Sequence, residues 1–388
     1  MKLETLYSRR GDGKVQEWTI EVEDDKFRTL SGLTDGQKVI SEWTIAKAKS
    51  IGRSNATTPE SQAIAEAKAK WQKKRDKGYS PTIEAVDDHG LFKPMLAHNY
   101  EDHKTKLFKK NQCILSQCKI NGMRAITRAD GMWTRNGKSI TSCPHIVKVL
   151  APLFLKYPDL VLDGELYNHE LRHKLNRIME LVRKSILSKE DLEKAEESIQ
   201  YYIYDGVNID SLGADCLYSQ RMPAIMANLK TLKSTVLVPV KATVVNTEEE
   251  LDKEFKQLLA DDWEGQMIRI DAPYQNKRTS KLLKRKLFVD SEYVIVDVIE
   301  GIGNWTGAAK SIVCQHPDGR TFSSNIEGDY EYLQQVLKDR LSLIGKTATV
   351  KYFEKTEYDI PQFPFVTAID REGAEGESCP RKDKSSVK

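Results

Sequence analysis

The stretch Gln117-Cys118-Lys119-Ile120-Asn121-Gly122-Met123-Arg124 places a lysine, a glycine and an arginine at a spacing that suits covalent nucleotidyl transfer. In that chemistry a lysine amine attacks a nucleotide phosphate, so Lys119 is the candidate nucleophile. One lysine in a chain with 60 Lys and Arg residues carries little information by itself. The carboxylates, cations and aromatic residues further along the chain therefore decide the prediction.

Length and composition predict several folded domains. The chain has 388 residues, which exceeds the usual size of one hydrophobic core, so two or three domains are expected. The 60 basic and 57 acidic residues leave a net charge of only +3, so any surface that binds nucleic acid must be local. Because no apolar run could span a bilayer and the first residues lack the apolar core of a signal peptide, we expect a cytoplasmic protein, in the infected cell if a phage encodes it.

The cysteines argue against a zinc site. None of them forms the close C-x-x-C pair of a zinc knuckle, and their scattered positions indicate free thiols in a reducing compartment. They are Cys113, Cys118, Cys143, Cys216, Cys314 and Cys379.

The first 88 residues predict a small sheet and one helix. Trp18, Ile20 and Val22 alternate with polar residues, as in a strand, and Thr58-Pro59 suits the start of a helix that ends near Gly78. One face of this helix is basic, and we expect it to contact DNA, although such a face is more often only solvated. The segment weakly resembles the Trp-Gly-Arg domains of some nucleic-acid enzymes, but the triplet itself is absent. The basic residues are Lys68, Lys70, Lys73, Lys74, Arg75 and Lys77.

The rest of the chain divides into a mixed region and an all-strand region. Short apolar runs alternate with turns and helical segments over 89–288, which suits mixed sheets flanked by helices. Within it, the text from His169 to about Ser198 reads as helical. Strands with a single helix between them follow over 289–372, the pattern of a five-stranded oligonucleotide-binding (OB) barrel. The polar, Lys-rich residues 373–388 predict a flexible tail.

A phosphate-binding loop is not the source of nucleotide binding here. The Gly-rich stretch 303–311 lacks the Gly-Lys-Ser succession of a P-loop, because two alanines intervene, so it reads as a connection between barrel strands.

Residues far apart in the sequence have the chemical groups that nucleotide transfer requires. Attack by Lys119 needs a neutral amine. Nearby cations favour this form because they lower the pKa of the amine, and Arg124, Lys284 and Lys286 are candidates for such cations. Lys284 and Lys286 fall on one face of a predicted strand and suit the phosphates, with Arg285 on the other face. Two carboxylates, Glu165 and Glu264, suit a ribose hydroxyl and a Mg²⁺ ion, and Tyr204 offers a ring for base stacking.

In this order the motifs resemble those of the covalent nucleotidyltransferases, the superfamily of ATP-dependent polynucleotide ligases and capping enzymes. Lys119-Ile120-Asn121-Gly122-Met123-Arg124 resembles the family's Lys-x-Asp-Gly-x-Arg. The family's further motifs are matched, in the same order, by segments of this chain. These segments are Thr134-Arg135-Asn136-Gly137, Asp163-Gly164-Glu165, Tyr204-Asp205, Glu264-Gly265 and Leu283-Lys284-Arg285-Lys286. The resemblance runs from about Lys93 to Arg371, and Lys93-Pro94-Met95-Leu96-Ala97 looks like the opening of a DNA ligase catalytic domain.

The resemblance implies a role for each residue. Gln117 would lie near the adenine amino group, Tyr204 would stack on the base and Glu165 would hold the ribose. Arg124 and Arg135 would contact the adenylate or the 5′-phosphate of the nick, and Arg371 would orient pyrophosphate. Glu165 and Glu264 would hold the metal, with Lys284 and Lys286 on the phosphates. Asn121 stands where the family usually has aspartate, which removes one charge near Lys119 and keeps an acceptor oxygen.

The sequence therefore predicts an α+β multidomain protein: a nucleotidyltransferase domain followed by an OB-fold barrel and preceded by a small accessory domain. The expected activity is ATP-dependent sealing of nicks in duplex DNA with Mg²⁺, or Mn²⁺ as the alternative ion, by a monomer that clamps its DNA. Three alternatives remain open, namely an RNA ligase, a GTP-using capping enzyme and a non-catalytic protein that binds nicks or ends. A ligase that uses NAD is disfavoured because the four-cysteine zinc site is missing.

Overall fold

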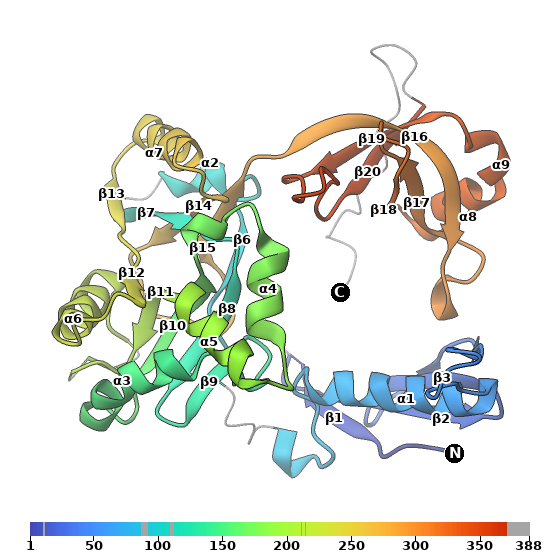
Figure 1. The fold of residues 1–388 in the computed structure, drawn as a ribbon, viewed down its shortest axis with the longest axis horizontal. Helices are drawn as coiled ribbons and strands as arrows, with labels where there is room; N and C mark the ends of the chain where they lie inside the picture. The colour runs from blue at the N-terminus through green and yellow to red at the C-terminus, as the bar shows by residue number, and fades with distance from the viewer. Residues whose placement is uncertain (11, 87–91, 109–111, 211, 214, 371–388) are drawn as a thin grey trace. The chain divides into compact units, whose positions relative to one another are not determined.

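The computed structural model describes residues 1–10, 12–86, 92–108, 112–210, 212–213 and 215–370 (Figure 1). Arg371 and Cys379 lie outside these residues. The chain forms two compact units, of which one is Leu91–Leu287 and the other combines Met1–Gly90 with Phe288–Lys388. Below we call 1–90 the N-terminal part, 91–287 the central part and 288–370 the C-terminal part.

The N-terminal part is a small sheet with one helix packed on it. Its strands are β1 (Leu6–Arg9), β2 (Val15–Glu23), β3 (Lys26–Leu33), β4 (Lys38–Ile40) and β5 (Thr44–Ile45), in the order β1-β2-β3-β4 with β5 beside β3. Trp18, Ile20 and Val22 on β2 form a core with alanines of helix α1 (Pro59–Arg75). The helix begins as predicted, because the Thr58 hydroxyl accepts a hydrogen bond of 3.2 Å from the Ser61 N–H.

The central part contains two five-stranded sheets, which we name after a strand in each. The β7 sheet has the order β13-β7-β14-β15-β6 and the β10 sheet has the order β12-β11-β10-β8-β9. The β7 sheet consists of β6 (Leu96–Asn99), β7 (Ile114–Lys119), β13 (Thr243–Val245), β14 (Gly265–Ile270) and β15 (Arg278–Lys286). The β10 sheet consists of β8 (Met123–Arg128), β9 (Gly131–Thr134), β10 (Val161–Tyr167), β11 (Gln200–Val207) and β12 (Leu237–Pro239).

Helices pack on both sheets of the central part. Helix α7 packs on β7, β13 and β14, while α6 packs on β11 and β12 (Figure 1). The helices are α2 (Lys104–Leu107), α3 (Pro144–Lys156), α4 (Leu175–Arg183), α5 (Lys189–Ser198), α6 (Tyr218–Thr231) and α7 (Glu248–Ala260), with a short 3₁₀ turn at His169–Leu171. Another 3₁₀ turn, Glu84–Val86, belongs to the N-terminal part.

The helical segment predicted from His169 to about Ser198 is interrupted. Helix α4 ends at Arg183, and α5 starts separately at Lys189 because Ser188 caps it: the Ser188 hydroxyl accepts from the Asp191 N–H, and the Asp191 carboxylate accepts from the Ser188 N–H. This reciprocal cap is visible in the sequence as Ser-x-x-Asp and was not used in the prediction.

The two sheets face each other through buried polar contacts. On the β7 sheet, Gln266 points to helix α7, where its amide donates to the Leu251 carbonyl at 3.1 Å. Arg269 points the other way and forms an ion pair of 2.5 Å with Asp205 on β11. Because side chains alternate along a strand, residues that share a face with Arg269 also face the β10 sheet.

The C-terminal part is a closed five-stranded barrel in the order β16-β17-β18-β20-β19. One helix, α8 (Tyr330–Lys338), and the short α9 (Arg340–Leu343) lie between the third and fourth strands in the chain, and the Gly-rich stretch forms a 3₁₀ turn (Gly303–Trp305) between β16 and β17, as predicted. The strands are β16 (Val289–Glu300), β17 (Ala309–Gln315), β18 (Thr321–Ile326), β19 (Thr347–Tyr352) and β20 (Phe365–Ile369). The predicted fold class is confirmed.

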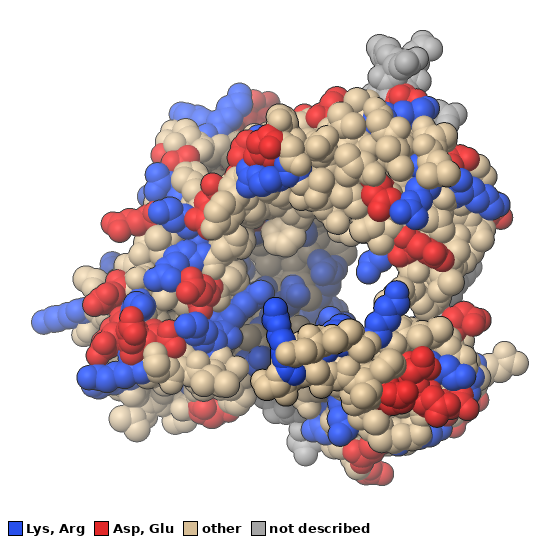
Figure 2. Space-filling model, turned by 45° about the vertical axis from the view of Figure 1, so that its right-hand side comes forward, with Lys and Arg blue, Asp and Glu red and all other residues tan. Residues whose placement is uncertain are grey.

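Charge and hydropathy agree with the composition. Basic and acidic side chains both occur over the face that Figure 2 shows. Among the residues described, no helix is long and apolar enough to cross a membrane.

Candidate active site

Lys119 and Lys286 both contact the carboxylate of Glu264. Lys119 ends β7, and the antiparallel register pairs it with Gly265 at the start of β14, which in turn pairs with Lys286 on β15. The ammonium groups of Lys119 and Lys286 each form an ion pair with Glu264, whose side chain is buried. The direct partner of the candidate nucleophile is thus an anion, so Lys119 must leave this ion pair to attack a phosphate.

Glycines let the strands approach closely around this carboxylate. A Cβ atom added at Gly122 would lie 2.5 Å from the Leu166 carbonyl oxygen and 2.8 Å from Cγ of Glu165. A Cβ atom at Gly265 would lie 2.3 Å from the Arg285 carbonyl oxygen. Both distances are shorter than any tolerated contact, so the glycines of the Asn-Gly and Glu-Gly pairs are needed for packing.

We expect Gly122→Ala to lower the rate of covalent nucleotide transfer by about 10- to 100-fold, because the new methyl group displaces the strand that carries Glu165. Labelling by α-³²P-ATP under single-turnover conditions measures this rate. Gly213→Ala is the matched control, because a Cβ atom there meets nothing within 4 Å, and it should behave like the unmodified protein. Equal rates for both variants would contradict the packing argument.

Arg124, Glu165 and Tyr204 gather on the β10 sheet. Arg124 on β8 is the direct neighbour of Glu165 on β10, so both side chains lie on one face. Tyr204 lies within β11, which continues to Val207. Asp163 pairs with Asp205 and Gly164 with Ile203, which makes Tyr204 the extra residue of a β-bulge. The bulge turns the Tyr204 hydroxyl toward Glu165, at 3.3 Å.

Asp163, Met95 and Tyr274 hold Arg124 in place, and of these the sequence analysis did not name Tyr274. The Arg124 guanidinium donates to both carboxylate oxygens of Asp163, at 2.8 and 2.5 Å, and to the Met95 carbonyl at 2.9 Å. The Tyr274 hydroxyl donates to the same carboxylate at 2.6 Å. Asp163 is 1% exposed, so this bidentate pair fixes the arginine within the sheet.

The surroundings of Glu165 shift the pKa of its carboxyl. Burial raises the pKa of its carboxyl to about 7, although Lys119 and Arg124 act in the opposite direction. The group therefore keeps its proton near neutral pH more than a solvated glutamate does. A ligand that offers a hydroxyl or a cation to this carboxylate would favour the ionised form.

This raised pKa predicts a pH-dependent stability difference. The folded protein binds the Glu165 proton more tightly than the unfolded chain, so this residue lowers the free energy of unfolding as pH rises from about 4.5 to about 7. Glu165→Gln does not titrate, so its free energy of unfolding relative to that of the unmodified protein should rise across this range, by about 3 kcal/mol. Thermal melts between pH 4.5 and 8 test this, and a constant difference would contradict it.

Gln117 belongs to a buried network that the sequence analysis also missed. Its Oε1 accepts from Nε of Arg269 at 2.6 Å, and its Nε2 donates to the Tyr218 hydroxyl at 2.8 Å. Arg269 in turn contacts Asp205, which also binds Arg221 at 2.8 Å. The available signal was Arg269 itself, a charged residue inside the apolar strand Met-Ile-Arg-Ile and on the face that carries Lys119.

The remaining predicted residues are Lys284, Arg285, Arg135, Asn121 and Arg371. Lys284 shares a face with Lys286, and burial together with Lys286 and Lys119 lowers its pKa. Arg285 points away and pairs with Asp252 of α7 at 2.6 Å, as the strand alternation predicted. Arg135 follows β9, is exposed and forms no ion pair with any residue that the structure describes. Asn121 lies half-buried in the turn between β7 and β8, and Arg371 lies outside the described residues.

The carboxylates fit a metal only together with a nucleotide. Within the described part of the chain, no group of three or more His, Cys, Asp or Glu side chains could hold an ion by itself. Mg²⁺ commonly takes one or two carboxylates, several waters and substrate phosphates. Glu165 and Glu264 match that donor set, and the phosphate oxygens of a nucleotide would complete it.

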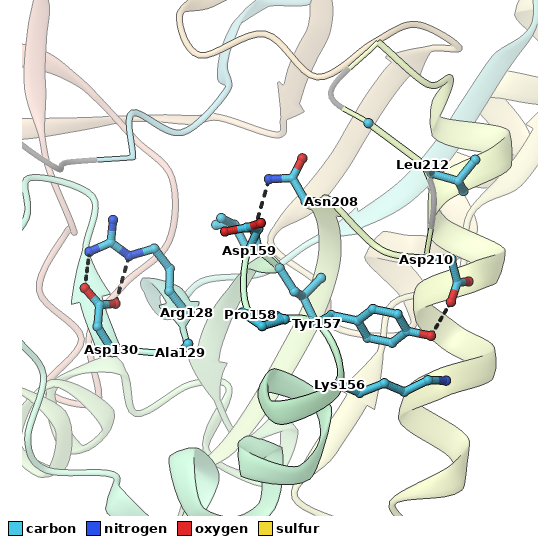
Figure 3. Close-up of a pocket in the computed structure, with 13 residues that line it drawn as sticks. Arg128, Ala129, Asp130, Lys156, Tyr157, Pro158, Asp159, Asn208, Asp210 and Leu212 are labelled. Carbon is cyan, nitrogen blue, oxygen red and sulfur yellow. Dashed lines mark hydrogen bonds and ion pairs between the residues drawn. The ribbon is translucent and has the colours of Figure 1, made fainter.

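A separate depression on the central part is not the nucleotide site. It is lined by residues 128–130, 156–161 and 208–213, with gaps, and holds none of the predicted site residues (Figure 3). Its polar groups contact one another: Arg128 pairs with Asp130 at 2.6 Å, and Asn208 donates to the Asp159 carbonyl at 3.0 Å (Figure 3).

Comparison with known proteins gives a consistent result. The family model described as "ATP dependent DNA ligase domain" matches residues 94–286. The DNA ligase of African swine fever virus, isolate Pretoriuskop, is 26% identical over 394 aligned positions that cover 90% of both chains. The DNA ligase of Haemophilus influenzae is 22% identical and covers 58% of this chain and 75% of its own. A solved Lig E DNA ligase has a TM-score of 0.56 at 21% identity, over 72% of this chain and 99% of its own.

Proposed function

The chain belongs to the ATP-dependent DNA ligases, and we propose that it seals nicks in duplex DNA through a lysyl-AMP intermediate on Lys119. One observation carries this proposal. The residues matched by the ligase domain model contain a lysine that ends a buried strand and contacts a buried carboxylate, with a second lysine on that same carboxylate.

Three transfers make up the reaction. Lys119 Nζ attacks the α-phosphorus of ATP, a P–N bond forms and pyrophosphate leaves. The 5′-phosphate at the nick then takes AMP and frees Lys119, and the 3′-hydroxyl displaces AMP to form the phosphodiester bond. The chain contributes mainly positioning and charge: Tyr204 stacks on the base and Glu165 accepts from the ribose, while Lys284 and Lys286 neutralise the phosphates.

Metal and phosphate contacts complete the proposal. Mg²⁺, with Mn²⁺ as the alternative, would be held by Glu165 and Glu264 and would supply positive charge at the reacting phosphate. Arg124 and Arg135 would contact the adenylate or the 5′-phosphate, and the exposed Arg135 is free to do so without breaking an ion pair with a described residue. We assign pyrophosphate orientation to Arg371, as the resemblance implies.

A joining assay with varied substrates tests the activity. Nicked duplexes with a DNA or RNA strand on either side of the nick are offered with ATP or GTP and Mg²⁺. We expect sealing of the all-DNA nick with ATP. Joining of RNA nicks alone would indicate an RNA ligase, and covalent labelling from GTP alone a capping enzyme. Binding without joining under all conditions would indicate a non-catalytic nick-binding protein.

We propose that a monomer clamps nicked DNA and that the accessory part, about residues 1–88, contributes by its basic helix. The alignment with the viral ligase leaves a tenth of this chain uncovered, so it includes part of the residues before Pro94. Lys68 and Lys73 on α1, and Lys77 just after its end, are exposed and form no ion pair with a described residue. They are therefore available to DNA phosphates.

Replacing Lys68, Lys73 and Lys77 with glutamate should weaken binding to nicked DNA. The salt dependence should also become shallower, because each lost phosphate contact lowers the slope of log K against log salt by about 0.9. Fluorescence anisotropy at several salt concentrations measures both quantities. The rate of covalent labelling by ATP, which needs no DNA, is the control. An unchanged affinity and slope would show that this face is only solvated.

A further inference from the structure

Gln117, the predicted adenine contact, adjoins a buried network of charged side chains. Gln117, Arg269, Asp205 and Arg221 are 2%, 3%, 0% and 1% exposed. Asp205 lies between the two guanidinium groups, and although burial alone would raise its pKa, Arg269 and Arg221 lower it below its usual value. The carboxylate is thus a fixed anion that holds Arg269 in one place. The Arg269 guanidinium also lies 4.7 Å from the ring centroid of Tyr218.

The partners of Gln117 determine which way its amide faces. Arg269 has only donors, so the atom at 2.6 Å from its Nε must be the amide oxygen. The Val240 carbonyl has only acceptors, so the atom at 3.4 Å from it must be the amide nitrogen. The Tyr218 hydroxyl could serve either role and therefore decides nothing. The orientation of the Gln117 amide thus follows from the chemistry of its partners.

This orientation leaves Gln117 with a single remaining hydrogen-bonding capacity. Its two N–H groups are occupied by Tyr218 and Val240, and one lone pair of Oε1 is occupied by Arg269. One lone pair on Oε1 is left. Gln117 can accept one more hydrogen bond and cannot donate one.

The network also connects Gln117 with the proposed base-stacking residue. Gln117 and Lys119 are two residues apart on β7 and share a face. Arg269 NH2 reaches the Tyr204 carbonyl at 3.5 Å across the two sheets. A base stacked on Tyr204 with its phosphates at Lys119 therefore has Gln117 beside its edge.

We propose that Arg269 is the positioning residue that sets nucleotide specificity: it fixes the Gln117 amide so that the protein presents an acceptor, which selects adenine and rejects a purine with an oxygen at position 6. The inference rests on the proposed function, because it assumes that a nucleotide binds beside Lys119. Adenine carries an amino donor at that position, whereas hypoxanthine and guanine carry an acceptor, which would face the Gln117 oxygen without a proton between them.

A double-mutant cycle separates positioning from general structure. The preference is measured as the ratio of covalent labelling rates with α-³²P-ATP and α-³²P-ITP, whose base is hypoxanthine. In the unmodified protein ATP should be strongly preferred. Arg269→Lys keeps a cation near Asp205 but lacks the Nε donor, so the amide can flip and the preference should fall on the order of tenfold. In a Gln117→Glu background, both oxygens are acceptors and no flip is possible, so Arg269→Lys should leave the preference unchanged.

Two further variants guard against a folding defect. Arg221→Lys disturbs the same buried Asp205 without touching Gln117, and its preference should stay within about twofold of the unmodified protein. Tyr218→Phe keeps the ring and removes an acceptor for Gln117 Nε2, but Arg269 still holds Oε1, so its preference should also stay within about twofold of the unmodified protein. If Arg269→Lys does not fold, Arg269→Met, which also lacks the Nε donor, is measured in the same two backgrounds.

The outcomes distinguish this inference from the proposed function. An unaltered preference in Arg269→Lys, or an equal fall in the Gln117→Glu background, would overturn the positioning role while the ligase proposal stands. An unmodified protein that takes label equally from ATP and ITP would also overturn it. Labelling from neither nucleotide would overturn both.

Discussion

Replacing Lys119 with alanine is expected to abolish nick sealing with ATP, because the covalent bond to AMP forms at Nζ of this residue. Lys286 contacts the same carboxylate, yet it lies on a different strand and is assigned to phosphate binding, so it should not substitute. Covalent labelling by α-³²P-ATP should fall below detection. Label that persists in the variant would show that another residue is the nucleophile.

A substrate that bypasses the first step is the control for this variant. A nick supplied with AMP already attached to its 5′-phosphate needs no lysyl-AMP, so Lys119→Ala should still join part of it. Lys281→Ala, on the strand that carries Lys284 and Lys286, should label normally, since Lys281 is outside the proposed site. Failure of Lys119→Ala on the pre-adenylated nick would point to lost structure and would not support a nucleophile role.

The second large effect is expected for Glu264→Gln. The buried carboxylate is the partner of both Lys119 and Lys286, and its removal leaves two ammonium groups close together without an anion. Glu264 is also a proposed Mg²⁺ ligand, so its loss should weaken the positive charge held at the reacting phosphate and lower the labelling rate on the order of 100-fold or more. Loss of one partner of a buried pair also commonly costs about 3–5 kcal/mol of stability.

The matched control for this change lies two residues earlier. Asp262 is an exposed carboxylate that pairs with Arg172 at 3.0 Å, and Asp262→Asn should leave the labelling rate within about twofold. Melting temperatures of both variants separate lost stability from lost chemistry. A Glu264→Gln protein that labels as fast as Asp262→Asn would contradict the central role of this carboxylate.

Local patterns predicted most of the fold. Alternating Trp18, Ile20 and Val22 gave the β2 strand its buried face, and the Thr58-Pro59 start of α1 follows from capping preferences that act within one turn. The barrel strands were recognisable for the same reason, because period-two alternation and turn residues are local properties. The break between α4 and α5 was missed although its cap is also local, since the charged composition masked the Ser188 signal.

The site was predictable where strand alternation decides it and not where distant residues meet. Lys284 and Lys286 fall on one face of β15 because they are two residues apart, and the resemblance supplied Glu264. The partners of Arg124 and Gln117 come from elsewhere in the chain: Tyr274 lies 111 residues from Asp163, and Arg269 lies 152 residues from Gln117. No local pattern reports such pairs. The bulge at Tyr204 is likewise set by the partner strand.

The central claim is that AMP is transferred from ATP to Lys119 and from Lys119 to the DNA 5′-phosphate. The full-length protein is labelled with α-³²P-ATP and Mg²⁺, freed of nucleotide and mixed with an unlabelled nicked duplex that carries a 5′-phosphate. We predict that the label lies on the peptide that contains Lys119, disappears from the protein on addition of the nick and is released as AMP when the strand is sealed. Label on another residue, or label that stays on the protein while nicks are sealed, would contradict the account.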